Sequence, residues 1–435
     1  MSVRSNPFAD RFPMRSALLI CSLLAVFFAA WQSHPPHVLA PFAEASPNPA
    51  KVAAPAQYTS RFVSTQLTDF VHSSSVTALP GGDLMAVWFA GSREGAADVQ
   101  VRTARFDARS GEWGAEQVLA TRESTRDGTQ RYIRKLGNPV IALGPDKRLW
   151  MFYVSVSVGG WAASAINLMV SEDFGASWSA PRQLVTSPFF NISTLVRAAP
   201  VFHADGSIGL PVYHEFMGKF AEYLYLSAGG AVIDKFRISR GKHSLQPTIV
   251  PLDGKRAVAM LRYAGDTHHR VLASRTEDAG QTWSEPYPLE PANPNSSLAA
   301  VGTVDDGLLV ALNDLEDGRF KLSLYGTDAQ LSHWRTVVQL DESPDPLGQP
   351  FSPEAYKAII GEGFRASSGA RRLPLEQRFL SNLDYRVCKP QGCDFEYEYP
   401  YFSRSPDGMY HLVYSWNNTF IKHVSFNEAW LAERL

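Results

Sequence analysis

One eight-residue pattern occurs twice in this chain and constrains its fold more than any other feature. Residues 171–178 (SEDFGASW) and residues 276–283 (TEDAGQTW) both read Ser/Thr-x-Asp-x-Gly-x-x-Trp, and each copy lies between segments typical of β-strands. The Asp carboxylate can accept hydrogen bonds from nearby backbone N–H groups, and the Gly supplies a positive φ. The Trp ring can then cover the turn. We therefore interpret both copies as structural turns without a chemical role.

Six residues define these two turns, namely Asp173, Gly175, Trp178, Asp278, Gly280 and Trp283. They resemble the Asp-box, or bacterial neuraminidase repeat, of sialidase-like β-propellers. A third, degenerate copy begins at Thr327-Asp328 and ends at Trp334, with the Gly lost and one residue added.

Strand-like segments follow one another from residue 58 to the C-terminus. Examples are residues 83–89, 149–156, 257–263 and 409–415, and Gly-Asp or Asp-Gly turns punctuate the chain. Regular short strands with a recurring aromatic motif indicate a propeller. Division of this part of the chain by six gives a reasonable blade size. The sequence thus predicts an all-β fold, a sialidase-like six-bladed β-propeller over residues 58–435, preceded by an N-terminal hydrophobic segment.

The N-terminus has the features of an export signal. Arg4, Arg11 and Arg15 precede the apolar run ALLICSLLAVFFAAW, and no Lys or Arg follows before Lys51. Positive charge on one flank predicts that the N-terminus stays in the cytoplasm and the rest is exported. We expect residues 1–15 to be a cytoplasmic tail and residues 16–31 a transmembrane signal anchor or a signal peptide. Residues 32–57, rich in Pro and Ala, would be a stiff linker. The propeller would be membrane-anchored in the periplasm or outside the cell, or secreted if the signal is cleaved.

The charge of the chain does not suggest nucleic acid as a partner. The chain has 41 Lys and Arg against 43 Asp and Glu, and no basic stripe that would suit nucleic acid.

Two cysteines are expected to form a disulfide. Cys388 and Cys393 flank a short turn, and an exported domain is expected to join them; two free thiols are the alternative. No metal site or cofactor is expected, because no second Cys or His pair lies nearby. We expect a monomer.

The resemblance to sialidases also implies a site. That family holds an anionic sugar with three Arg residues and uses a Tyr nucleophile, activated by a Glu, with an Asp as acid/base. Arg suits the task because its planar fork binds a carboxylate bidentately. Arg93 follows the first inner strand, Arg262 matches the second Arg position, and Arg319 is a weaker match to the third. Tyr399 lies eight residues before the turn Asp407-Gly408, as the nucleophilic Tyr does in the family.

The departures from the family pattern are equally specific. The place of the first Arg reads Val71-His72-Ser73, and the Glu that would activate the Tyr falls near Ser244 or Leu245. The loop for the acid Asp is short, so Glu94 or Asp98 must substitute for it. This pattern favours a re-specialised pocket, and it resembles the sialidase-like Asp-box proteins of bacteria and plants.

Several further residues are candidates with a structural alternative. His72 is either catalytic or a hydrogen-bonded strand residue, and Arg93 either binds substrate or pairs with Glu94 or Asp98. Asn295 binds a sugar hydroxyl or caps a turn. Lys422 and the pair His214-Glu215 are further anion-binding or acid/base candidates.

The local sequence around Tyr399 limits its choice of base. Residues 396–401 read Glu-Tyr-Glu-Tyr-Pro-Tyr, and alternation along a strand places the Tyr and Glu side chains on opposite faces. Neither Glu396 nor Glu398 can then serve as the base of Tyr399 without a bulge.

The resemblance implies an exported glycoside hydrolase that acts on an acidic or deoxy sugar of an extracellular glycan. One alternative is a glycan lyase, in which Tyr or His is the base beside an Arg-held uronate. Another is a non-catalytic glycan-binding or assembly propeller. A carboxylate or imidazole within about 3 Å of the Tyr399 hydroxyl would favour an enzyme, and an isolated hydroxyl would favour binding alone.

Overall fold

The computed structural model describes residues 12–32, 38–43, 54–63, 70–187, 191, 193–216, 218–241, 243–368 and 388–435. The chain divides into two compact units, Met1–Leu39 and Ala40–Leu435. The described part of the first unit contains the helix α1 (Phe12–Gln32). Within the described ranges, no helix combines the length and the apolar character needed to cross a membrane.

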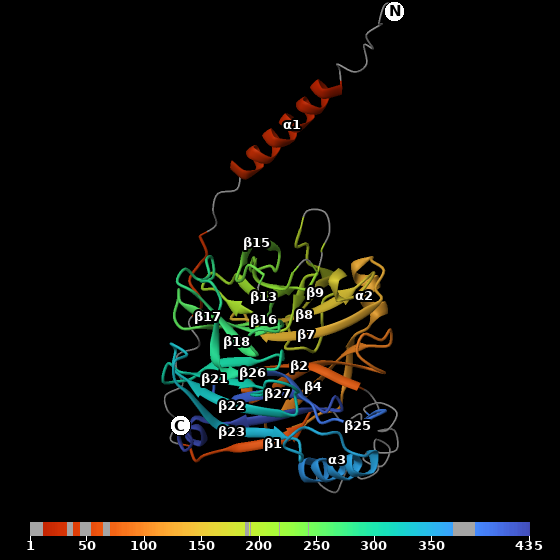
Figure 1. The fold of residues 1–435 in the computed structure, drawn as a ribbon, viewed down its shortest axis with the longest axis vertical. Coiled ribbons are helices and arrows are strands. Elements are labelled where there is room, and N and C mark those ends of the chain that lie inside the picture. The colour runs from red at the N-terminus through yellow and green to blue at the C-terminus, as the bar shows by residue number, and fades with distance from the viewer. Residues whose placement is uncertain are drawn as a thin grey trace, which may run out of the picture. The chain divides into compact units, whose positions relative to one another are not determined.

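The second unit is a propeller, whose described residues form six antiparallel blades in chain order (Figure 1). The first blade contains β2 (Phe70–Ala78), β3 (Leu84–Gly91), β4 (Gln100–Asp107), β5 (Glu112–Trp113) and β6 (Gln117–Ala120). The second contains β7 (Lys135–Leu143), β8 (Leu149–Val156), β9 (Ser164–Ser171) and β10 (Arg182–Gln183). The third contains β11 (Leu195–Val196), β12 (Val201–Phe202), β13 (Ile208–His214), β14 (Phe220–Leu226) and β15 (Val232–Arg237).

Each of the remaining three blades has four described strands. The fourth contains β16 (Ser244–Pro251), β17 (Ala257–Tyr263), β18 (Arg270–Thr276) and β19 (Tyr287–Ala292). The fifth contains β20 (Ala299–Gly302), β21 (Leu308–Leu312), β22 (Lys321–Thr327) and β23 (Trp334–Glu342). The sixth contains β26 (Tyr397–Arg404), β27 (Tyr410–Trp416), β28 (Phe420–Phe426) and β1 (Tyr58–Phe62). The described helices of this unit are α2 (Arg122–Thr129), α3 (Pro353–Ser368), α6 (Glu428–Ala432) and two 3-10 turns, η1 (Pro80–Gly82) and η2 (Trp161–Ala163).

The two ends of the propeller sequence close the ring. Strand β1 pairs with β28 from Tyr58 opposite Phe426 to Phe62 opposite Lys422, so the start of the domain completes the last blade. In Figure 1 the orange β1 accordingly lies among the blue C-terminal elements. The first strand of the first blade, β2, contacts both β7 and β26, and the blades between follow in order. The predicted six-bladed propeller is confirmed.

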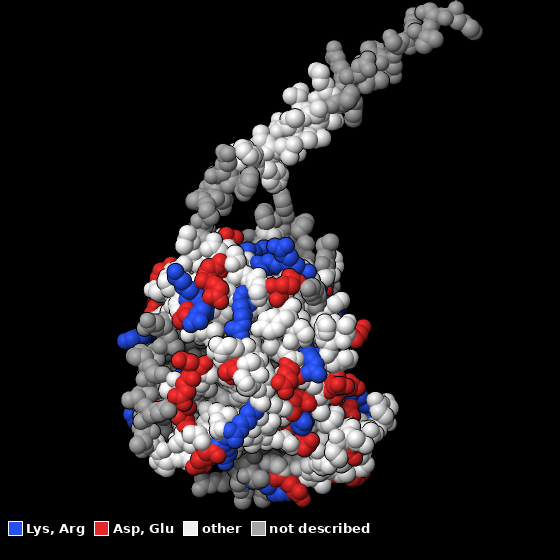
Figure 2. All heavy atoms as spheres, turned by 60° about the vertical axis from the view of Figure 1, so that its left-hand side comes forward, with Lys and Arg blue, Asp and Glu red and all other residues white. Residues whose placement is uncertain are grey.

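Burial explains why the second strands of the blades are almost entirely apolar. Every residue of β3 and of β8 is buried, because each strand is covered on both faces by neighbouring blades. On the face drawn in Figure 2, by contrast, Lys and Arg are interspersed with Asp and Glu.

Four inner strands carry an irregularity at matching places. The pairing of the first strand with the second shifts between His72 and Ser75, Gly137 and Val140, Leu245 and Thr248, and Glu398 and Tyr401. Each irregularity contains one residue with positive φ, namely Ser73 (53°), Asn138 (42°), Gln246 (48°) and Tyr399 (55°). Such bulges re-aim side chains and leave backbone groups outside the ladder. They therefore shape one end of the central axis.

The Asp-box turns have the predicted geometry. Oδ1 of Asp173 accepts a hydrogen bond from the Ser177 N–H at 2.8 Å, and Asp278 accepts one from Thr282 at the same distance. In the degenerate copy, Asp328 accepts one from the Ser332 N–H at 2.9 Å. The boxes connect β9 to β10, β18 to β19 and β22 to β23. In the third box Leu331, with a φ of 62°, is the residue in the left-handed region.

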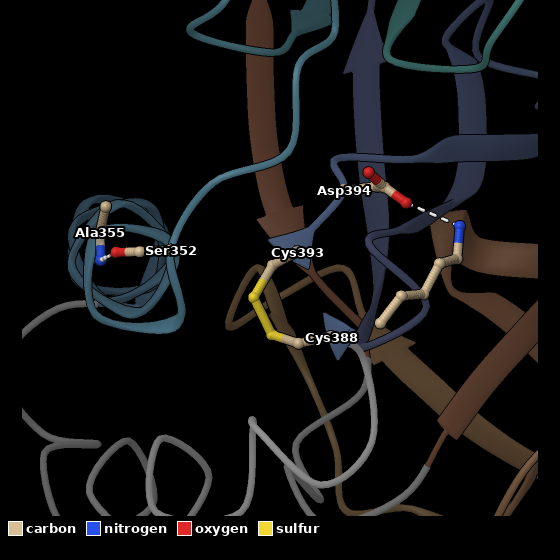
Figure 3. Close-up of a disulfide and its surroundings, with 6 residues drawn as sticks. Ser352, Ala355, Cys388, Cys393 and Asp394 are labelled. Carbon is tan, nitrogen blue, oxygen red and sulfur yellow. Dashed lines mark hydrogen bonds and ion pairs between the residues drawn. A yellow bond between two sulfur atoms is a disulfide. The ribbon is translucent and has the colours of Figure 1, made fainter. Parts of the chain in front are cut away.

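The predicted disulfide is present. Cys388 and Cys393 are bonded, with 4.1 Å between their Cα atoms, and they join the hairpin of β24 (Cys388–Lys389) and β25 (Gly392–Cys393) (Figure 3). Beside it, Lys389 Nζ lies 2.6 Å from a carboxylate oxygen of Asp394. The backbone of Cys393 also pairs with Phe351, just before α3.

Part of the predicted linker belongs to the propeller unit. Phe42 is 2% exposed, and its N–H donates to the Gly254 carbonyl at 2.8 Å. His203 Nδ1 lies 2.7 Å from the Ala40 carbonyl oxygen. The boundary at residue 57 is therefore too late for residues 40–43, because the aromatic ring of Phe42 is buried on the propeller.

Candidate functional site

Two arginines from adjacent blades meet at one asparagine. Arg262, on β17, donates from Nε to the side-chain oxygen of Asn295 at 2.7 Å. Arg319, in the turn between β21 and β22, donates from Nη2 to the backbone oxygen of Asn295 at 3.0 Å. Asn295 has a φ of 56°, so both its side chain and its carbonyl are fixed within a tight turn before β20. Residues that are far apart in sequence thus share one end of the propeller.

An amide network extends this arrangement to the inner strands of other blades. Arg262 donates from Nη1 to Gln246 Oε1 at 3.2 Å, and Gln246 Nε2 is 3.5 Å from the Tyr399 hydroxyl. The same Nε2 lies 3.4 Å from the Tyr213 hydroxyl, which also accepts a hydrogen bond from Asn138 Nδ2 at 3.1 Å. Asn138, Gln246 and Tyr399, whose side chains take part in this network, all have a positive φ. Together with the residues described next, these side chains form the central cluster, defined as His72, Asn138, Arg197, Tyr213, Gln246, Arg262, Asn295, Arg319, Glu398 and Tyr399.

A buried carboxylate neutralises one of the two arginines. Arg319 forms an ion pair with Glu398, whose other oxygen lies 3.7 Å from His72 Nδ1. The side chains of His72 and Glu398 are each 6% exposed. Burial would raise the pKa of Glu398, but His72 and Arg319 together lower it below its ordinary value. Burial lowers the pKa of His72, against the opposing effect of Glu398 and Glu94, so the imidazole is neutral near pH 7.

The second arginine has a different environment. The hydrogen-bond partners of Arg262 are the neutral amides of Asn295 and Gln246, and within the described ranges no carboxylate forms an ion pair with it. Glu215 is close enough for its pKa to respond: burial raises the pKa of Glu215, and Arg262 opposes that rise. Arg262 is therefore the cation of this pair that can bind an external anion.

Among the residues that the structure describes, no protein base forms a hydrogen bond with the Tyr399 hydroxyl. In the described part of the chain, its hydroxyl has Gln246 as hydrogen-bond partner and no carboxylate or imidazole. The ring of His72 lies edge-on to the Tyr399 ring, with 4.3 Å between centroids. The bulge that could bring a Glu to the same face does exist between Glu398 and Tyr401, but Glu398 is engaged with Arg319. By the criterion set from the sequence, these contacts of the Tyr399 hydroxyl favour binding alone.

Three other predicted residues of the first blade, Arg93, Glu94 and Asp98, lie at the rim, in the loop between β3 and β4. Arg93 and Glu94 are exposed, and Arg93 Nη1 is 3.5 Å from the backbone oxygen of Glu94. Asp98 accepts hydrogen bonds from the N–H and the hydroxyl of Ser92, at 3.0 and 2.9 Å, and so shapes the loop. Glu94 lies near enough to affect the pKa of His72.

Other predicted residues lie elsewhere. Lys422 is on β28, and its Nζ is 2.8 Å from both oxygens of Asp341 on β23. The ring of His214 stacks on Phe220, with centroids 4.6 Å apart. Lys422 is thus paired with a carboxylate of the neighbouring blade, and its role in binding an anion stays a prediction. A third strand lies farther from the axis than a first strand.

Five members of the central cluster were not among the predicted site residues, namely Asn138, Arg197, Tyr213, Gln246 and Glu398. Two signals in the sequence mark most of them. Asn138, Gln246 and Tyr399 each precede a Pro, and Arg197 is a single charge within the run LVRAAP. A charge in an apolar segment is costly unless it is paired. No group of three His, Cys, Asp or Glu side chains suited to a metal ion occurs in the described residues.

The fold and the central cluster define a sialidase-like β-propeller built from Asp-box repeats. The chain belongs to the BNR repeat-like domain family, which matches residues 82–412. No curated protein matches the chain.

Solved structures show the same fold at low sequence identity. A protein of unknown function from Dyadobacter fermentans is 11% identical, with a TM-score of 0.60, over 88% of this chain and 99% of that chain. An intramolecular trans-sialidase from Ruminococcus gnavus is 13% identical, with a TM-score of 0.58, over 86% of this chain and 97% of that chain. A leech intramolecular trans-sialidase is 12% identical, with a TM-score of 0.59, over 88% of this chain and 72% of that chain.

Proposed function

We propose that this protein recognises an acidic sugar of an extracellular glycan and hydrolyses its glycosidic bond. The fold shared with trans-sialidases supports hydrolysis, whereas the contacts of the Tyr399 hydroxyl support binding alone. The observation that carries the proposal is the meeting of Arg262 and Arg319 at Asn295, next to Tyr399. Of these two arginines, only Arg319 forms an ion pair with a carboxylate in the described structure. The planar fork of Arg262 suits a sugar carboxylate, which would supply the missing negative charge.

The roles follow from position and charge. Arg262 binds the carboxylate of the sugar, and Asn295 and Gln246 hold the guanidinium in place. Tyr399 is the nucleophile, and Gln246 orients its hydroxyl by a hydrogen bond. The neutral imidazole of His72, edge-on to the Tyr399 ring, is the candidate base, and Glu94 at the rim is the candidate acid. The similarity to trans-sialidases in fold supports an acidic sugar as the substrate class.

Hydrolysis is tested with a matched pair of fluorogenic glycosides and the full chain. We expect release of the fluorophore from a methylumbelliferyl sialoside and much less from the neutral galactoside. Tyr399→Phe, which keeps the ring and removes the hydroxyl, should abolish this release. Release that is equal for both substrates, or that survives Tyr399→Phe, would contradict the proposed reaction.

The second candidate is a non-catalytic protein that binds the same acidic sugar. It is favoured by the absence of a carboxylate or imidazole hydrogen bond to the Tyr399 hydroxyl in the described structure. For such a protein, calorimetry would show binding of the acidic sugar with no turnover, and Tyr399→Phe would leave the affinity unchanged. A hydrolase would show turnover in the unmodified chain.

We also propose that the propeller is exported. Support comes from the three Arg residues ahead of the apolar run and the absence of Lys or Arg between this run and Lys51. An alkaline phosphatase fusion after Lys51 should be active, and an inactive fusion would contradict export. Recovery of the full chain in membranes would indicate an anchor, whereas a released product that begins near Pro41 would indicate cleavage.

A further inference from the structure

Arg197 is a buried cation for which the proposed chemistry has no use. It follows β11 in the third blade, and it is 3% exposed. In the described part of the chain it has no carboxylate partner, and burial lowers its pKa to about 10, so it stays charged at neutral pH. A charge so deeply buried is costly unless specific acceptors compensate for it.

The acceptors of Arg197 are two carbonyls on the opposite side of the ring. Its Nη2 donates to the backbone oxygen of Tyr399 and, at 3.0 Å, to that of Pro400. Both acceptors are on β26 of the sixth blade. Because the third and sixth of six blades face each other, the Arg197 side chain reaches across the central axis.

The bulge in β26 explains why these carbonyls need a donor from elsewhere. The ladder between β26 and β27 pairs Glu398 with Ser415 and Tyr401 with Val413, and it skips Tyr399 and Pro400. Backbone carbonyls that leave a ladder in the interior must be satisfied by other donors. The guanidinium group of Arg197 donates hydrogen bonds to both carbonyls.

The same guanidinium also contacts the aromatic side chains of the bulge. Its central carbon lies 4.9 Å from the ring centroid of Tyr399 and 5.8 Å from that of Tyr401. Tyr399 has a φ of 55°, a backbone conformation that bulky residues rarely adopt without support. Arg197 therefore contacts the backbone of this unusual residue and the face of its ring together.

We propose that Arg197 is a positioning residue, which holds the Tyr399 bulge from across the axis and so sets the place of the Tyr399 ring. Through that ring it also fixes the approach of Tyr399 to Gln246 and His72. The inference rests on the proposed function only in giving Tyr399 a role toward the substrate.

The test observes the Tyr399 ring directly and needs no substrate. The full chain would carry 3-fluorotyrosine at position 399 alone, and its ¹⁹F resonance would be recorded for the unmodified chain, Arg197→Met and Arg197→Lys. Met keeps a long side chain without a buried charge, a type of change that proteins often tolerate. Lys keeps the charge but lacks the planar fork.

Two controls separate positioning from general loosening. A second probe at Tyr153, a buried residue of the second blade, reports on the core. Arg102→Lys alters another largely buried arginine, whose Nη1 pairs with Glu116 at 3.4 Å. We expect Arg197→Met to shift or broaden the Tyr399 resonance, Arg197→Lys to do so less, and Arg102→Lys to have no effect on it. The Tyr153 resonance should not change in either Arg197 variant.

Three results would overturn the inference. They are an unchanged Tyr399 resonance in folded Arg197→Met, equal changes at Tyr399 and Tyr153, and failure of both Arg197 variants to fold, which would make the residue a general core element. Because the probe reports without ligand, absence of hydrolysis in the unmodified chain would count against the proposed function and leave this inference standing.

Discussion

The indole Nε1 of Trp113 in the first blade donates a hydrogen bond to Nδ1 of His423 in the sixth, at 3.3 Å. An Nδ1 that accepts places the proton of the neutral ring on Nε2, which lies 3.2 Å from Nδ1 of His411. His411 then donates from Nε2 to the Ser405 hydroxyl at 3.1 Å, and Ser405 donates to Asp407. The hydrogen bonds thus run in one direction, and they require both imidazoles to be neutral.

Acid should therefore weaken this contact between the first and the sixth blade. Burial lowers the pKa of His411 to about 4, against the opposing charge of Asp407. Burial also lowers the pKa of His423 well below its ordinary value, and His411 and Arg61 add to that effect. The unfolded chain takes up these protons near the ordinary pKa of about 6.5. Stability should be complete above that pH and fall as the pH drops toward 4, by about 1.4 kcal/mol per pH unit for each histidine. Urea unfolding at a series of pH values measures the slope.

A variant isolates this contribution from that of other histidines, since burial also lowers the pKa of His72 and His203. The double variant His411→Gln/His423→Gln retains amide donors and acceptors but cannot take up protons. Its stability should depend on pH less steeply than that of the unmodified chain between pH 6.5 and 4. Identical slopes would show that the pair does not respond to pH.

The Asp-box tryptophan should matter for stability and not for the site. Trp283 is partly buried, packs near Tyr223 with ring centroids 6.1 Å apart, and donates from Nε1 to the Gly280 carbonyl at 2.8 Å. Trp283→Ala should lower the free energy of unfolding by about 2–3 kcal/mol, less than for a fully buried ring. Trp283→Phe, which loses the hydrogen bond but keeps a ring, should cost about 1 kcal/mol. A variant of full stability that no longer binds the sugar would refute this structural role.

The ion pair of Glu398 with Arg319 should be coupled. Glu398→Gln leaves the Arg319 guanidinium without its countercharge, so we expect a loss of about 3 kcal/mol, near the lower end for breaking a buried pair. Arg319→Gln should also be destabilising. In the double variant the losses should be clearly less than additive, because no buried charge is then left uncompensated. Urea unfolding of the four proteins completes the cycle, and strict additivity would mean that the pair is not coupled.

The repeat pattern alone was sufficient to predict the propeller and its turns. The boxes at Asp173 and Asp278 depend on contacts within eight residues, and the disulfide closes a short hairpin, so neighbouring residues determine both. The meeting of Arg262 and Arg319 at Asn295 agrees with their match to the Arg positions of the family.

The chemistry around Tyr399 could not be predicted in the same way. Alternation placed Glu398 on the face opposite Tyr399, and only the bulge, with a φ of 55° at Tyr399, changes that relation. Pro400 is the one local sign of this bulge. The contact from Arg197 depends on which blade faces which. The pairing of Lys422 with Asp341 depends on the position of its strand in the blade, which sets its distance from the axis. These are tertiary relationships that local patterns do not carry.

The most direct test of the central claim compares an acidic sugar with its neutral methyl ester as ligands of Arg262→Ala. A well-desolvated Arg–carboxylate contact contributes about 1.5–3 kcal/mol, so calorimetry should show about a ten- to hundred-fold loss of affinity for the acid. The ester should lose far less, and Arg262→Lys should recover only part of the affinity. Arg256→Ala is the matched control, since Arg256 is exposed and paired with Asp253, and it should not change either affinity. Equal losses for the acid and the ester in Arg262→Ala would contradict the claim that Arg262 binds the carboxylate.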